Sequence, residues 1–105
     1  MIPYTTPSFV VTISGGVNLT QAVNVYVTLT QGSVSVTKNS TDVEISQDGK
    51  TVSVRLSQNE SMKFDKGKAK LQVNWVYTEN GKTIRASTEP LVVKVEEQLY
   101  KQVIT

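Results

Sequence analysis

The chain has 105 residues, a formal net charge of +2, and neither cysteine nor histidine. This length is typical of one domain that folds around its own core without disulfide staples. The missing residue types exclude disulfides, thiolate metal sites and histidine as a general base. The charge is too small to indicate a nucleic-acid partner, and no apolar run is long enough to span a membrane. We therefore expect a single domain over residues 1–105, with no nucleic-acid or membrane partner.

Branched and hydroxyl-bearing residues dominate the composition. Valine contributes 17 residues, and serine with threonine another 23. β-Branched side chains pack well on a pleated sheet and lose χ1 freedom in a helix. The composition therefore predicts an all-β fold.

The chain begins with residues 1–7, which contain two of the three prolines and are expected to form an extended lead-in. Apolar and polar residues then alternate in successive short segments, which is the pattern of strands with one buried face. Residues 96–105 form a tail whose spacing allows either a final helical turn or an added strand. The expected strands are residues 9–13, 25–29, 34–36, 43–45, 52–56, 68–78, 82–87 and 91–95.

Three pairs of residues that end in glycine indicate tight turns. Gln31-Gly32 predicts a hairpin between the second and third strands. Asp48-Gly49 predicts a two-residue type I′ turn, because both central residues of that turn need a positive φ. Asn80-Gly81 predicts the same turn after the longest strand.

One segment departs from the strand pattern. Ser57 and Glu60 have the spacing of a capping box, in which each side chain bonds to the backbone N–H of the other residue. This spacing predicts one short helix near residues 57–64, with Met62 or Phe64 beneath the sheet edge. A helix this short depends on packing for its stability.

The longest alternating stretch, residues 68–78, contains Trp75, the only tryptophan of the chain. Burying an indole removes roughly 150–250 Å² from water, so this strand is the expected centre of a sheet. Parity along this strand and two others predicts which side chains face the core. They are Trp75, Leu71, Val73, Val25, Val27, Leu29, Val54 and Leu56.

The spacing of the strands indicates the architecture. Seven to eight short strands with turn signals at near-regular intervals favour an Ig-like antiparallel β-sandwich over alternating βαβ units. A small open barrel is the alternative fold. No linker, low-complexity segment or internal repeat divides the chain.

The residue types needed for common catalytic sites are missing or scattered. No Ser–His or Cys–His pair can form in this chain. The acid pairs Asp42 with Glu44 and Asp48 with Glu60 do not match the spacing of a Ca²⁺-binding loop. We therefore expect no enzymatic activity, no metal site and no cofactor.

Lys63, Lys66, Lys68 and Lys70 form a small basic cluster. A nucleic-acid site needs more positive charge than this and exposed aromatic side chains on which bases stack. We interpret the cluster as a solvated row that protects a sheet edge from pairing with another edge.

Five residues are candidates for a partner interface. In the tail, Leu99 with Val103 and Tyr100 with Ile104 are spaced by four, and one small sandwich does not fully cover this apolar surface. Tyr26 lies on the opposite face of its strand from the valines, so it is expected to be exposed. An exposed tyrosine suits a protein interface or a sugar.

Several motifs occur together in a fixed order. They are Leu19-Thr-Gln-Ala22 before Asn24–Gly32, the Asp48-Gly49 turn before Thr51–Ser61, Phe64, Gly67, Leu71–Tyr77, Asn80-Gly81 and Arg85-Ala-Ser87. This order resembles the small Ig-like β-sandwiches of bacteriophage and prophage structural genes. The family that it resembles most is the N-terminal domain of phage baseplate upper proteins, over roughly residues 9–95.

The resemblance implies a non-enzymatic structural module of a phage tail or baseplate, made in the bacterial cytoplasm and present in the assembled particle. It implies no catalytic residues. Baseplate upper proteins continue beyond such a domain, whereas this sequence ends at Thr105. A stand-alone subunit is therefore expected, bound to other phage structural proteins or to copies of itself. The alternative is a carbohydrate- or cell-surface-binding module that uses Tyr26.

Overall fold

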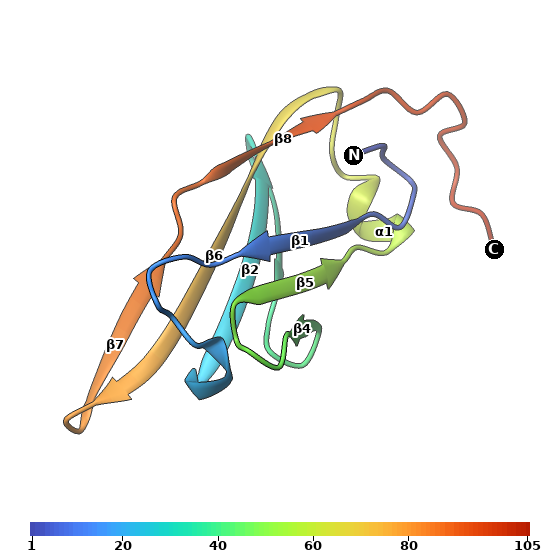
Figure 1. The fold of residues 1–105 in the computed structure, drawn as a ribbon. Helices are drawn as coiled ribbons and strands as arrows, with labels where there is room; N and C mark the ends of the chain where they lie inside the picture. Colours follow the sequence, from blue (N-terminus) through green and yellow to red (C-terminus); the bar gives the residue numbers. More distant parts are fainter.

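The structure is a computed structural model that describes all residues 1–105 (Figure 1). Its elements are β1 (Ser8–Thr12), η1 (Leu19–Gln21), β2 (Asn24–Gln31), β3 (Val34–Lys38), β4 (Val43–Ile45), β5 (Thr51–Arg55), α1 (Gln58–Ser61), β6 (Gly67–Glu79), β7 (Lys82–Ser87) and β8 (Leu91–Val95). The eight strands and the lone short helix confirm the expected all-β fold.

Two antiparallel sheets form the layers of a sandwich. The first sheet has the order β1-β5-β4, and the second has the order β3-β2-β6, with β7 and β8 both paired to β6. These orders correspond to strands B-E-D and C′-C-F-G of an immunoglobulin-type sandwich. The expected Ig-like sandwich is therefore confirmed, and the open barrel is not formed.

β6 is the central strand of the second sheet. β2 pairs along one of its edges, and β7 and β8 share the other edge one after the other. Trp75 lies opposite Ala86 and Leu71 lies opposite Leu91, so β6 advances four residues while the facing strands advance five. The extra residue is a β-bulge in the segment between β7 and β8.

The core lies between the two sheets and includes 16 buried apolar residues. The eight residues expected in the core are all buried, from Val73 at 0% exposed to Trp75 at 6%. Period-two alternation explains this arrangement, because one face of β2, β5 and β6 is apolar along most of each strand. Trp75 lies in β6 among these residues, and it borders two hollows that are described below.

The observed turns agree only in part with those predicted from the sequence. Asn80 and Gly81 have φ values of 50° and 76° and join β6 to β7 in the expected two-residue hairpin. The prediction of a type I′ turn at Asp48-Gly49 is wrong, because only Gly49 has a positive φ, of 72°. The Ser46 N–H donates to the Thr51 C=O at 3.1 Å and leaves a four-residue loop, residues 47–50. This longer loop lets Gly49 pack against the segment that contains η1.

The expected helix forms, but it is shorter than residues 57–64. Its N-terminus has the complete capping box, in which the Ser57 hydroxyl accepts from the Glu60 N–H and Glu60 accepts from the Ser57 N–H. The helix ends after one turn. Phe64 lies beneath the sheets at 2% exposed, whereas Met62 faces solvent at 40%.

The two ends of the chain lie at the same end of the molecule (Figure 1). Met1 runs beside β8, because its N-terminus donates to the Lys94 C=O and its C=O accepts from the Glu96 N–H. The expected extended lead-in instead turns at Pro3, and Tyr4 has a positive φ of 67°. Residues 96–105 form neither a helical turn nor a strand.

Candidate attachment site

The C-terminal tail, residues 96–105, exposes the apolar side chains that the sequence analysis selected. Leu99 is 91% exposed, Tyr100 62%, Ile104 64% and Val103 38%. None of the four belongs to the buried core. Apolar side chains in this number, gathered within six residues of one segment, are typical of a contact surface for a partner.

Polar contacts nevertheless hold the tail backbone against the domain. The Gln58 side chain donates from Nε2 to the Ile104 C=O at 2.7 Å and accepts the Ile104 N–H at Oε1 at 2.8 Å. Gln98 Nε2 donates to the Pro3 C=O at 3.2 Å. These bonds position the tail beside α1 and the lead-in, while its apolar side chains remain uncovered.

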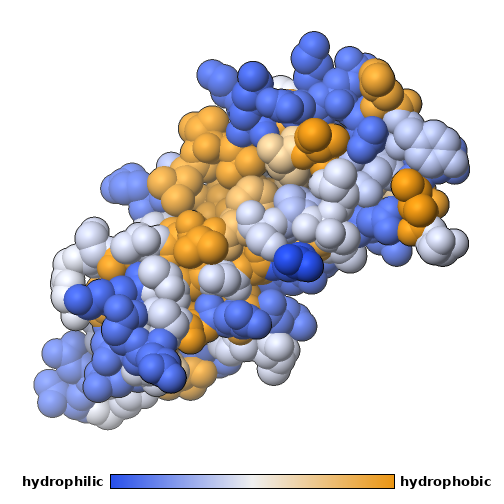
Figure 2. Space-filling view, turned by 45° about the vertical axis from the view of Figure 1, so that its right-hand side comes forward, coloured by the Kyte–Doolittle hydropathy of each residue, from blue (hydrophilic) through white to orange (hydrophobic).

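One flank of the sandwich is open between the edge strand β1 and the strands β7 and β8. A hollow of about 320 Å³ lies there. Val11 and Ile13 line it from the side of β1, Thr88 and Leu91 line it from the other side, and Trp75 borders it as well. Figure 2 shows hydrophobic side chains spread across the middle of one face of the molecule. On this flank the second sheet contributes Leu91, whose side chain is 45% exposed.

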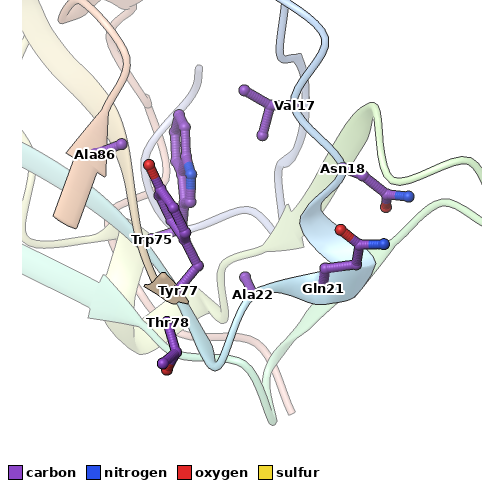
Figure 3. Close-up of a pocket in the computed structure, with 8 residues that line it drawn as sticks. All are labelled: Val17, Asn18, Gln21, Ala22, Trp75, Tyr77, Thr78 and Ala86. Carbon is purple, nitrogen blue, oxygen red and sulfur yellow. The ribbon is translucent and has the colours of Figure 1, made fainter. Parts of the chain in front are cut away.

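A second hollow, of about 330 Å³, adjoins Trp75 and Tyr77 (Figure 3). The two aromatic rings form one wall, and Val17 and Ala22 from the segment around η1 lie across from them. The amide side chain of Asn18 lies at the polar side of the hollow, with that of Gln21 close by. An apolar wall with a few polar groups at the rim is typical of a site that binds side chains or small ligands.

Trp75 also offers a hydrogen-bond donor. Its indole N–H has no partner within the chain, and no fully buried side-chain nitrogen or oxygen is left without a partner. The indole nitrogen therefore reaches solvent although the residue is only 6% exposed. Figure 3 shows this nitrogen on the edge of the ring that faces Val17 and Asn18.

Tyr26 lies on the outer face of the second sheet, beside Asn74 and Arg85. The Asn74 Oδ1 accepts from Arg85 Nε at 3.2 Å, from Arg85 Nη2 at 3.1 Å and from the Ser87 hydroxyl at 2.6 Å. Tyr26 and these residues border a shallow hollow of about 400 Å³. Tyr26 lies opposite Asn74, whereas the tail follows Val95, which lies opposite the first residue of β6. The five candidate interface residues therefore form two separate surfaces.

Two carboxylates, those of Asp48 and Glu60, serve the local structure. Burial acts to raise the pKa of Glu60, but hydrogen bonds from Lys38, at 2.7 Å, and from the Ser57 N–H outweigh it and hold this pKa below its ordinary value. Hydrogen bonds from the Ser46 hydroxyl and the Lys50 N–H lower the pKa of Asp48. No three His, Cys, Asp or Glu side chains gather as metal ligands would.

The interpretation of the lysines as an edge-protecting row is wrong. Lys68 and Lys70 belong to β6, which is paired on both edges. Lys68 lies opposite Lys94, and like charges in that position weaken strand pairing. Lys68 and Lys70 therefore make the outer face of the second sheet basic and guard none of its edges.

Comparison of the chain with family models, curated proteins and solved structures finds no match. No helix of the structure has the length and apolar character needed to cross a membrane.

Proposed function

We propose that the chain is a non-enzymatic assembly module of a phage or prophage particle, associated with its tail or baseplate. Residues 97–105 attach it to a neighbouring subunit. The observation that carries this proposal is the uncovered tail, in which Leu99, Tyr100 and Ile104 are each more than half exposed. The resemblance of the motif order to phage sandwich domains supports the setting.

The strength of the contact follows from the apolar side chains of the tail. Burying one aliphatic side chain of this size contributes roughly 1.5–3 kcal/mol. Association costs about 4–15 kcal/mol in lost freedom of motion. Leu99, Val103 and Ile104 together therefore support only a weak contact between two isolated chains. Repetition of the contact around a symmetric assembly strengthens it.

The partners in this proposal are copies of the chain or other phage structural proteins. Tail or capsid genes on both sides of the coding gene would support the setting. Metabolic genes on both sides would contradict it.

Deletion of residues 97–105 tests the attachment role. None of these residues belongs to the buried core, so we expect the shortened chain to keep its far-UV circular dichroism spectrum. We expect the intact chain to show a mass that rises with concentration in light scattering, and the shortened chain to show none of this rise. Equal behaviour of the two chains would contradict the proposal.

A second candidate function is binding of a carbohydrate or cell-surface ligand. The observation that favours it is Tyr26 beside Arg85 and Asn74 on an open sheet face, because sugars stack on aromatic rings and bond to planar polar groups. Arg85 has no acidic partner in either of the two ion pairs of the chain. Reproducible binding to a glycan array that Tyr26→Ala abolishes, and that Tyr100→Ala preserves, would support this function. A blank array would leave assembly as the proposed function.

A further inference from the structure

We propose that the free edge of β1 is a site for strand addition, and that the tail of a second copy of this chain is the strand that it accepts. This inference rests on the proposed function, because it names the surface to which the tail attaches. It is carried by three features: the backbone groups of β1, the flank beside it and a tail that belongs to neither sheet.

The backbone of β1 has unused hydrogen-bonding groups. The Ile13 N–H donates to the Lys50 C=O, and the Pro7 C=O accepts from the Leu56 N–H, so the odd-numbered residues of β1 face β5. In an antiparallel pair the intervening residues point the other way. The N–H and C=O groups of Ser8, Val10 and Thr12 therefore lie on the free edge.

β1 is also the least protected edge of the sandwich. Proteins guard edge strands with charged side chains, prolines, bulges or very short strands. β3 ends in Lys38, β4 has three residues, and β7 contains Lys82 and Arg85. β1 has five residues, no charge, no proline and no bulge, and its Val10 side chain is 68% exposed.

The flank beside this edge has room for apolar side chains. A hollow of about 320 Å³ lies beside β1, and a second hollow of about 330 Å³, which no residue of β1 lines, shares Trp75 with it. An apolar cavity of about 150 Å³ admits a benzene ring, so each hollow accommodates at least one large side chain. In a strand, residues four apart lie on one face and about 13 Å from each other. Leu99 with Val103, or Tyr100 with Ile104, thus supplies two apolar side chains on the face that turns toward the flank.

The tail of the same copy is kept away from this flank. Met1 occupies the edge of β8 next to the start of the tail, and Gln58 holds Ile104 beside α1. The tail projects from one end of the molecule, whereas η1 and the tip of the β6–β7 hairpin lie toward the other (Figure 1). The surface that supplies the strand, the tail, therefore differs from the surface that receives it, the free edge of β1. Such a head-to-tail contact builds a ring when the rotation closes and a filament when it does not.

Fluorescence of Trp75 tests the inference, because it is the only tryptophan and it borders both hollows. A synthetic peptide of residues 96–105 contains no tryptophan. Titrated into the dilute intact chain, it is expected to change the Trp75 emission in a saturable way. No change at any peptide concentration overturns the inference.

Two variants of Val10 test whether the backbone groups on the free edge of β1 bind the peptide. Val10→Pro removes an N–H that faces the free edge, a position where proline is tolerated in an edge strand, and is expected to weaken peptide binding at least tenfold. Val10→Thr keeps the N–H and the branched side chain, and is expected to bind within twofold of the unchanged chain. Equal binding by both variants overturns the inference.

Modified peptides give the same test without altering the domain. One peptide is N-methylated at Leu99, Lys101 and Val103, and the other at Tyr100, Gln102 and Ile104. Only the set whose N–H groups face β1 is expected to lose binding. Undiminished binding of both peptides means that the tail attaches elsewhere; the proposed function then stands if deletion of the tail still abolishes self-association. If the intact chain does not self-associate, the attachment of the tail to copies of this chain fails, and the peptide titration still decides whether β1 accepts a strand.

Discussion

Thr88 hydrogen-bonds to both backbone groups of Val73. Its N–H donates to the Val73 C=O at 2.9 Å, and its hydroxyl accepts from the Val73 N–H at 3.1 Å. The contact lies where β7 has ended and β8 has not begun. Because Val73 is 0% exposed, its N–H has no access to water. One side chain therefore continues the ladder of β6 across the bulge that separates its two edge strands.

Thr88→Ala is expected to destabilise the domain by about 1–3 kcal/mol, because it leaves a buried backbone donor without a partner. Thr88→Ser keeps the hydroxyl and is the matched control. Urea unfolding of the two variants measures the difference. Equal free energies of unfolding would show that the hydroxyl contributes nothing to the ladder.

Gly49→Ala is expected to destabilise the domain more than Gly81→Ala. Both glycines have a positive φ, of 72° and 76°, so both substitutions place alanine in an unfavourable conformation. A Cβ on Gly49 would overlap the Asn18 Oδ1 and lie 2.8 Å from the Leu19 backbone nitrogen, whereas a Cβ on Gly81 would meet nothing within 4 Å. We expect the clash to add about 1–3 kcal/mol, the usual cost of overpacking. Equal losses in thermal unfolding would contradict the close packing of η1 on the β4–β5 loop.

Trp75→Ala is expected to cost about 3–5 kcal/mol, the range for truncating a large buried aromatic side chain. We expect this loss because Trp75 is only 6% exposed and lies opposite Ala86 in the central strand β6. Denaturant unfolding followed by circular dichroism measures the loss, since the substitution removes the fluorophore. A loss below about 1 kcal/mol would contradict the central place of this side chain in the core.

Local sequence determines several elements that were predicted correctly. Asn80-Gly81 forms its turn because both residues tolerate a positive φ. Ser57 and Glu60 form their capping box because the two partners lie three residues apart. Alternation along β6 predicts which of its side chains are buried, because strand parity is a property of the strand itself.

Contacts between distant residues explain what the sequence did not predict. Gly49 belongs to a longer loop because Leu19 donates to its C=O at 2.9 Å, and nothing near Asp48 in the chain indicates this contact. The alternating pattern does not reveal which strands pair with β6, so the prediction of a sheet edge at Lys68 and Lys70 is wrong. The hollow beside Trp75 and Tyr77 is not predictable from the sequence for the same reason, since its two walls come from segments about 55 residues apart.

Glu60 is expected to make stability depend on pH. Its pKa in the folded chain lies below the ordinary value of 4.5, so the contribution is fully present above pH 4.5 and is lost as the pH falls through the lower, folded-state pKa. The difference in unfolding free energy between the unchanged chain and Glu60→Gln should therefore be constant near neutral pH and shrink in acid. Glu89→Gln, which removes an exposed carboxylate outside both ion pairs, is the control. A difference that grows on acidification would contradict the assigned role of the contact with Lys38.

The molar mass of the intact chain in solution tests the attachment role of the tail most directly. Sedimentation at increasing concentration is expected to give a mass that rises above the 11.5 kDa of one chain. The rise should disappear when Leu99 and Tyr100 are both replaced by serine, and should persist in Gln102→Ser. A mass that remains at 11.5 kDa at every concentration would contradict the account.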